Sequence, residues 1–448
     1  MISRKSFFLL SAFLLIAGLS YTRAASRPKP NVLIIIADDL GWADIGYHGS
    51  KIRTPTLDRL ARQGIRLERH YVMPTCTPTR VALITGRYPS RYGVVSPAYG
   101  QIFDRHTVTL AQVLKDCGYY TAISGKWHMG SPPSCVPRRY GFISSYGYFH
   151  GQIDPYTHLY KNGERCWHRN DVLVDETGHA TDLITNEAVR VIRETKDRPF
   201  FLYVAYSVPH YPLNEPEQWT APYKKVFKEP SRRWYAASVT HMDSGIGRIL
   251  KALEETGKRN STLIIFTSDN GGQRSWHSTT QYGGAYADRP HVRLGDNRPL
   301  RGWKGELYEG GIRVPAFAHW PGVLKPGILN EPIHAVDWFP TICSVTGCKP
   351  PKPLPWDGVN VWPLLTGERK TLGPRVMYWK TPSAQAVFRG DWKLIRFRKR
   401  KRLELYNVTE DPYEKNELSA ERPDLLKSLE ALLDRIAQKD RPRVGRGR

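Results

Sequence analysis

The 448-residue sequence has few cysteines, no internal repeat and, after its first 25 residues, no long hydrophobic run. Six cysteines are too few for a dense disulfide scaffold. Because a membrane-spanning helix needs about 20 consecutive apolar residues, we expect no membrane association of the chain beyond residue 25. Apolar residues make up 40% of the sequence and charged residues 24%, which excludes a mostly disordered protein.

The hydrophobic run that is present lies at the N-terminus. It extends from Phe7 to Leu19, follows Arg4 and Lys5, and precedes small residues at Ala24 and Ala25. This order is typical of a secretory signal peptide over the first 25 residues, and a retained anchor is the alternative. We therefore expect a secreted or periplasmic protein, or a lysosomal or extracellular one in a eukaryote.

Acidic residues are scarce relative to basic ones. Lys and Arg number 66 against 42 Asp and Glu, which gives a formal net charge of +24. So positive a surface favours polyanionic partners, although it can also serve solubility alone. An exported protein meets sulfated or uronic polysaccharides more often than nucleic acid, so we expect a glycan partner and no nucleic acid.

The cysteines allow some pairing in an exported protein. Cys135 with Cys166, and Cys343 with Cys348, are possible disulfides that the sequence cannot prove. Cys117 sits in an apolar stretch and is most simply a buried thiol.

Buried strands alternate with helices over more than 300 residues. Apolar runs bounded by polar residues predict strands at 32–37, 199–206 and 262–266, and amphipathic spacing predicts helices at 54–63 and 234–255. This alternation indicates an α/β fold with a large, mostly parallel sheet sandwiched by helices.

The pattern changes near residue 374 to short strands and turns. We expect strands at 376–379, 385–389, 392–396 and 403–406, followed by a helix at 423–438. The predicted organisation is a main α/β domain at 26–373, a C-terminal subdomain with an antiparallel sheet and one helix at 374–438, and a frayed basic tail at 439–448.

A short motif places a cysteine at a helix N-terminus. Cys76 opens the sequence CTPTR, and Pro78 fits the first turn of a helix that Val81 to Ile84 continue. Backbone N–H groups and the helix dipole favour negative charge there, so both an anionic substrate group and its nucleophile suit this position.

Together with other blocks, this motif resembles the type I sulfatases, in which that cysteine is oxidised to formylglycine (3-oxoalanine) by a formylglycine-generating or anaerobic maturating enzyme. The similar blocks, in the family's order, are NVLIIIADDLGW at 31–42, CTPTR and TGR at 76–87, GYYTAISGKWH at 118–128, TSDNGG at 267–272, WKGELYEGGIRVP at 303–315 and LYNVTEDPYEKNEL at 405–418. The resemblance implies an alkaline-phosphatase-like fold. GYHGSKIRT at 46–54 and NRPLRGWKGELYEGG at 297–311 are most similar to the arylsulfatase B-like (N-acetylgalactosamine-4-sulfatase) subgroup.

The resemblance implies a metal site with one Ca²⁺ held by Asp38, Asp39, Asp269, Asn270 and the group derived from Cys76. Hard Ca²⁺ prefers carboxylate and amide oxygens, and a zinc site would need His or Cys ligands nearby. Acidic residues just past the carboxyl ends of predicted strands fit a ligand site in an open α/β sheet. The alternative is that Asp38 and Asp39 only cap a strand end.

A sulfate monoester is an anion, so its nucleophile must be surrounded by positive charge. The residues that match the family's cationic and proton-transferring positions are Arg80, Lys126, His128, His210 and Lys304. His210 taken alone could also be a packed loop histidine, but Lys126 and His128, two apart on an extended segment, would face one ligand.

The family's chemistry implies a hydrated aldehyde at Cys76. One hydroxyl, deprotonated with help from Asp269, attacks sulfur, and the alcohol leaves protonated by Lys304 or His210. This gives a covalent sulfo-formylglycine intermediate. The second hydroxyl, with His128 as base, then expels sulfate. The expected substrate is a sulfated polysaccharide or glycosaminoglycan-type oligosaccharide, with a sulfate like that of galactosamine or galactose 4-sulfate.

An insertion between the calcium ligands and Lys304, residues 276–295, is predicted to overhang the mouth of the active site. Aromatic rings stack on sugars and arginines pair with sulfate or carboxylate groups. The candidate substrate-binding residues are Trp276, His277, Arg289, His291 and Arg293. The alternative is a solvated glycine-rich loop.

Two other functions stay open. A phosphatase or phosphonate hydrolase of the same superfamily would act on similar esters, but the extra His and Asp ligands of two-zinc phosphatases are not found in position. A non-catalytic polyanion-binding protein would explain the charge but not the filled catalytic positions. The oligomeric state is not predicted.

Overall fold

The computed structural model describes residues 29–98, 100–104, 106–131, 133–398 and 401–444. The predicted signal peptide lies outside these residues. Among the described residues, no helix combines the length and the apolar character needed to cross a membrane.

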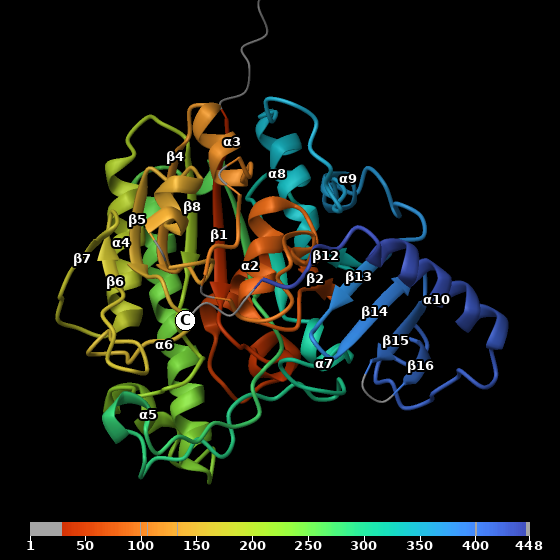
Figure 1. The fold of residues 1–448 in the computed structure, drawn as a ribbon. Helices are drawn as coiled ribbons and strands as arrows, with labels where there is room; N and C mark the ends of the chain where they lie inside the picture. Colours follow the sequence, from red (N-terminus) through yellow and green to blue (C-terminus); the bar gives the residue numbers. More distant parts are fainter. Residues whose placement is uncertain (1–28, 99, 105, 132, 399–400, 445–448) are drawn as a thin grey trace, which may run out of the picture.

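A ten-stranded sheet forms the centre of the molecule (Figure 1). Its order is β11-β2-β10-β9-β1-β8-β4-β5-β6-β7. The five central strands run parallel and comprise β9 (Thr262–Ser268), β1 (Asn31–Ala37), β8 (Phe200–Ala205), β4 (Tyr120–Lys126) and β5 (Ser144–Tyr148). Antiparallel pairs join β10 (Ala316–His319), β2 (Ile65–Leu67), β6 (Trp167–Arg169) and β7 (Val172–Leu173), and β11 (Gly327–Leu329) pairs parallel with β2.

Helices cover both faces of this sheet because its central strands are apolar on both sides. Leu33 and Ile35 of β1 belong to a core shared with α1 (Pro55–Gln63), α4 (Ala180–Glu194) and α6 (Pro230–Glu255). Val32 and Ile34 belong to the opposite core, with α2 (Cys76–Thr85), α3 (Leu110–Asp116) and α8 (Trp338–Thr346). The predicted mostly parallel sheet sandwiched by helices is confirmed.

The predicted C-terminal sheet and helix are also present. Strands β13 to β16 form an antiparallel meander, and α10 packs on β14 and β15 (Figure 1). Their bounds are Val376–Lys380, Ala384–Arg389, Trp392–Phe397, Arg402–Asn407 and, for α10, Pro423–Ala437. Shorter elements are β3 (His70–Tyr71), β12 (Ile333–His334), α5 (Glu217–Thr220), α7 (Glu309–Ile312) and α9 (Trp362–Leu365).

Two expectations, one on the cysteines and one on the tail, are wrong. Cys117 and Cys348 form a disulfide across 231 residues, with Cα atoms 5.9 Å apart, whereas Cys135, Cys166 and Cys343 are free. The chain reverses at the end of α8 and turns Cys348 towards the end of α3, where Cys117 is the C-cap, while Cys343 stays in the core within α8.

The described part of the tail is docked instead of frayed. The amide groups of Arg441 and Val444 donate to the carbonyls of Ser90 and Gly93, at 3.0 Å each. Asp440 accepts from Arg91 at 2.7 Å. The tail is held in place because its polar groups find hydrogen-bond partners on residues 90–93, which are distant in sequence.

A buried charge cluster joins the C-terminal sheet to the main body. The Nζ of Lys393, on β15, lies 2.6 Å from both Glu309 Oε1 and Glu414 Oε1. Burial raises the pKa of Glu414 to about 7, against the opposing charge of Lys393. Since Glu309 opens α7, this lysine also fixes the end of the loop that carries Lys304.

We predict that Lys393→Met lowers the free energy of unfolding by about 3–5 kcal/mol, because it leaves two carboxyl groups buried without their cation. Denaturant unfolding followed by circular dichroism measures the change. Lys427→Met, an exposed lysine on α10, is the matched control and should change stability by less than about 0.5 kcal/mol. Equal stability of the two variants would contradict the role given to the cluster.

Candidate active site

The predicted site residues meet at the carboxyl ends of the central strands. Asp38 and Asp39 follow β1, Asp269 and Asn270 follow β9, and Lys126 ends β4. Parallel strands bring these ends to one edge of the sheet, where open α/β folds bind ligands. The acidic residues are fully buried, so their charges must be balanced inside the protein.

The turn after β1 brings several side-chain oxygen atoms close together. Asp39 adopts a left-handed conformation with φ of 70°, and its backbone N–H donates to Asp269 Oδ1 at 3.2 Å. The Nδ2 of Asn270 donates to Asp39 Oδ1 at 2.7 Å, which leaves the amide oxygen of Asn270 free to face a ligand. Strain of this kind in a residue other than glycine is common at functional sites.

Two oxygens of this cluster fit a bound cation. Asp38 Oδ1 and Asn270 Oδ1 are buried and have no hydrogen-bond partner among the described residues. Burial and the nearby charge of Asp269 raise the pKa of Asp38 well above its usual range. Ligand atoms of Asp38, Asp39 and His210 also lie within 4.8 Å of one another. Carboxylate and amide oxygens in this number suit a hard divalent cation.

Each carboxylate is paired with one basic side chain. Lys126 Nζ donates to Asp38 Oδ2 at 2.6 Å, and Lys304 Nζ lies 2.7 Å from Asp39 Oδ1. Burial alone would lower the pKa of Lys304, but the charge of Asp39 raises it well above its usual range. The pairing holds these cations at fixed positions beside one another.

Arg80 completes the set from helix α2. Its Nη2 and Nε donate to Asp269 Oδ2 at 2.7 and 3.2 Å, and its Nη1 donates to the carbonyl of Lys126 at 3.0 Å. Because Arg80 stands four residues after Cys76 on one helix, both side chains face the same side.

Cys76 is the first residue of α2, as its motif predicts, and it is buried. Burial raises the pKa of its thiol, and the charges of Lys126 and Lys304 oppose that change. A buried thiol is a poor nucleophile at neutral pH, so this position is better suited to a modified side chain.

Two histidines flank the cluster. Burial, and then the charge of Lys126, lowers the pKa of His128 well below its usual range. Burial and Lys304 do the same for His210, whose Nε2 lies 3.7 Å from Asp39 Oδ2. Both imidazoles are therefore neutral at pH 7. Gly151 packs so closely on His128 that an added Cβ would lie 2.5 Å from its Cε1.

The insertion at 276–295 is folded onto the loop that carries His210. Trp276 stacks on Tyr211, with ring centroids 4.7 Å apart, and pairs through its backbone with His291. His291 is buried and its Nε2 accepts from the backbone N–H of Leu213 at 3.1 Å, so it holds the insertion in place and offers no exposed surface to a ligand. The exposed members of the predicted set are His277, Arg289 and Arg293.

Sequence reasoning missed the residues that support the turn after β1. Tyr235 on α6 donates to the carbonyl of Asp39 at 2.9 Å. Asp44 accepts from the N–H groups of Gly41 and Asp296 and pairs with Arg232. The only sequence signal was a further acid, Asp44, soon after the Asp38-Asp39 pair.

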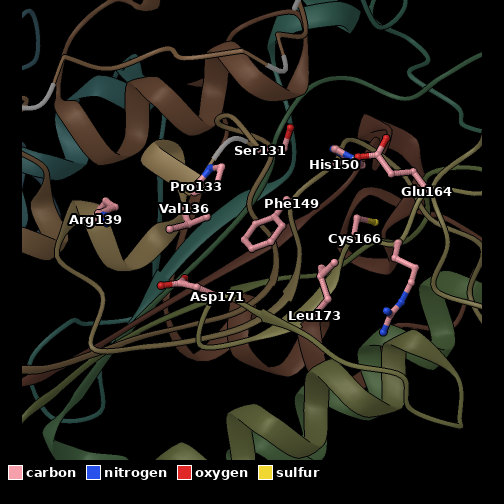
Figure 2. A pocket seen from close by; sticks show the side chains of 11 residues that line it. Ser131, Pro133, Val136, Arg139, Phe149, His150, Glu164, Cys166, Asp171 and Leu173 are labelled. Carbon is pink, nitrogen blue, oxygen red and sulfur yellow. The ribbon is translucent and has the colours of Figure 1, made fainter. Parts of the chain in front are cut away.

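A separate pocket of about 520 Å³ lies near the segment that carries His128. Figure 2 shows the side chains that line this pocket. Its lining includes Ser131 and Phe149, and the backbone N–H of His128 donates to the carbonyl of Phe149 at 3.1 Å. None of the predicted catalytic or metal-binding residues is among those that line it. The pocket therefore lies beside the cluster around Cys76 and is not the candidate active site itself.

Known proteins are similar to this chain over most of its length. The family model described as Sulfatase matches residues 30–348, and that described as N-sulphoglucosamine sulphohydrolase, C-terminal, matches residues 302–439. Arylsulfatase J of Mus musculus is 32% identical over 92% of this chain and 76% of its own length. Arylsulfatase A of Homo sapiens is 33% identical over 84% and 75%.

A solved structure supports the same assignment. Ps i-CgsB in complex with k-i-k-neocarrahexaose is 30% identical, with a TM-score of 0.83, over 92% of this chain and 94% of that one. These matches do not single out the 4-sulfatase subgroup expected from the sequence, since N-acetylgalactosamine-6-sulfatase of Canis lupus familiaris is similar too, at 32% identity over 85% of this chain and 74% of its own length. The chain belongs to the sulfatase family and is a sulfuric ester hydrolase.

Proposed function

We propose that this sulfatase removes sulfate from a sulfated galactose- or galactosamine-containing polysaccharide outside the cytoplasm, using formylglycine made from Cys76. The observation that carries the proposal is the position of Cys76, at the start of α2, among three basic side chains that are each fixed by a buried carboxylate. A maturating enzyme would have to oxidise Cys76, and the N-terminal residues support export.

The metal of the proposed site is a single Ca²⁺. Asp38, Asp39, Asp269 and Asn270 would hold it, because they offer oxygens only and two of those oxygens are buried without a hydrogen-bond partner among the described residues. When bound, the ion would act as a Lewis acid that withdraws charge from the sulfate ester. It would also balance the charge of Asp269 that, after burial, raises the pKa of Asp38.

The basic side chains bind and orient the sulfate group. Arg80 and Lys126 stand on the α2 and β4 sides of Cys76, and Lys304 approaches from the loop before α7. Since their carboxylate partners hold them before substrate arrives, they stabilise the growing charge on the sulfate oxygens with little rearrangement. Formylglycine, once formed and hydrated, supplies two hydroxyl groups at position 76.

Proton transfer falls to the residues at the edge of the cluster. Lys304 is protonated, since Asp39 raises its pKa, so its Nζ can give a proton to the leaving alcohol oxygen, with His210 beside it. His128 is neutral and can accept a proton from position 76.

The substrate class is inferred from charge and from similarity. The net charge of +24 favours a polyanion, and the similar protein Ps i-CgsB was solved in complex with k-i-k-neocarrahexaose. The insertion at 276–295 exposes His277, Arg289 and Arg293, whereas the residues around Cys76 are buried. We therefore assign substrate selection to the insertion and sulfate chemistry to the centre.

We predict that Lys304→Ala reduces kcat by about 10²–10⁴-fold on a glycan sulfate, because the poor alcohol leaving group needs a proton. The loss should be smaller on an activated aryl sulfate, whose leaving group is stable without one. Steady-state rates on both substrates measure the difference, and Lys325→Ala, an exposed lysine, is the control. Equal losses of kcat on both substrates would show that Lys304 does not protonate the leaving group.

We predict that the double substitution Arg289→Ala and Arg293→Ala raises KM for a sulfated oligosaccharide by roughly 10-fold or more, since two exposed charge-assisted contacts are lost. Activity on a small aryl sulfate should not change. Arg422→Ala, at an exposed arginine just before α10, serves as the matched control. If both substrates are affected alike, the insertion supports the fold and does not select the glycan.

A further inference from the structure

A second buried cluster of metal-ligating side chains lies outside the catalytic centre. His179 caps the N-terminus of α4, Glu215 lies in the loop after β8, and His241 is on α6. One ligand atom from each lies within 4.8 Å of the others, and all three residues are at most 8% exposed. Figure 1 shows α4 and α6 on the same side of the sheet, with α5, which begins two residues after Glu215, at their lower end.

Two buried atoms of this cluster face each other. His179 Nε2 and Glu215 Oε1 lie 3.5 Å apart, within ion-pair distance, and neither makes a close hydrogen bond in the described part of the chain. This spacing is that of two ligands on one tetrahedral ion with bonds of about 2.0–2.1 Å. Buried polar atoms without partners call for an explanation such as an ion or a water.

The second histidine has the surroundings of a metal ligand. His241 Nδ1 lies 2.8 Å from Glu215 Oε2, and its Nε2 lies 3.3 Å from Asp182 Oδ2. Asp182 is in turn held by Arg248 at 3.0 Å. A carboxylate on the far nitrogen of a histidine fixes the ring, and Nδ1, which now bonds to Glu215, would become a metal ligand once it loses its proton. Trp219 stacks on the same ring, with centroids 4.8 Å apart, and shields it.

We propose that His179 Nε2, Glu215 and His241 Nδ1 bind one Zn²⁺, with water as the fourth ligand. Two imidazole nitrogens and one carboxylate suit zinc, whereas the oxygen ligands near Asp38 suit calcium. Asp182 is half exposed at the rim of the cluster and gives a path for the ion to enter.

Zinc binding changes the protons of the cluster. Without the ion, Asp182 and Glu215 outweigh burial and raise the pKa of His241 to about 9, so its imidazolium loses one proton when zinc binds. His179 Nδ1 accepts a weak bond from the N–H of Thr181 at 3.2 Å. If zinc binds Nε2 of His179, the imidazole proton moves to Nδ1. His179 then no longer accepts the bond from Thr181, and the zinc–nitrogen bond replaces it.

The ion would fasten the loop that also serves catalysis. Glu215 lies five residues after His210 and two after Leu213, which anchors the insertion through His291. Zinc would tie this loop to α4 and α6, two helices that pack on each other. The site thus has a structural role that is independent of the proposed sulfate chemistry.

The test uses the full-length enzyme, stripped with a chelator and then kept in saturating Ca²⁺ so that the calcium site does not compete. Titration with ZnCl₂ should show about one equivalent bound, and CoCl₂ should give the visible absorption of a tetrahedral site. Glu215→Gln keeps the shape but loses the charge, so it should weaken zinc binding by roughly 10–100-fold or more. His277→Gln and Cys76→Ala, both outside the cluster, should bind zinc like the unaltered protein.

The outcomes separate this proposal from the proposed function. Absence of stoichiometric zinc binding by the unaltered protein, or binding that Glu215→Gln leaves unchanged, would overturn the zinc site and show a hydrogen-bonded charge network instead. The visible absorption of bound cobalt is measured on the unaltered protein, so the test can still be made if a variant fails to fold. Since binding is measured without turnover, a failure of the sulfatase chemistry leaves this result intact.

Discussion

The mutual pairing of buried acids and bases at the carboxyl edge of the sheet is the constraint on which the active site depends. Asp38, Asp39 and Asp269 could not stay charged in the interior without cations, and the cations could not approach one another without these acids. Lys126, Lys304 and Arg80 satisfy that need from three separate elements. The same pairing fixes three cationic groups around Cys76 before substrate arrives, and a bound divalent cation would add the net positive charge that a sulfate ester requires.

The rest of the fold supplies the rigidity that this pairing needs. Central parallel strands fix the acids, the first turn of α2 fixes Cys76 and Arg80, and the buried Lys393 cluster holds the segment behind Lys304. Tyr235 of α6 holds the carbonyl of Asp39. The exposed insertion lies over a loop that is itself anchored, so the substrate selection proposed for it could vary without disturbing the residues around Cys76.

Sequence alone predicted what is locally encoded. The strand at 32–37 was predicted to within one residue because it is a continuous apolar run that ends at Asp38, and α2 because Pro78 and the apolar residues after it set its register. Contacts between distant segments were not predictable in this way. The Cys117–Cys348 disulfide, the docking of residues 439–444, the burial of His291 and the meeting of His179 with Glu215 all depend on how separate elements pack.

The central claim is that position 76 acts as a formylglycine within this ring of charges. The most direct measurement is mass spectrometry of the peptide that contains Tyr71 to Arg80, from protein produced in its own host, together with the sulfatase activity of the same sample. The account predicts an aldehyde at residue 76, in proportion to activity. Full activity in a sample whose Cys76 is an unmodified thiol would contradict it.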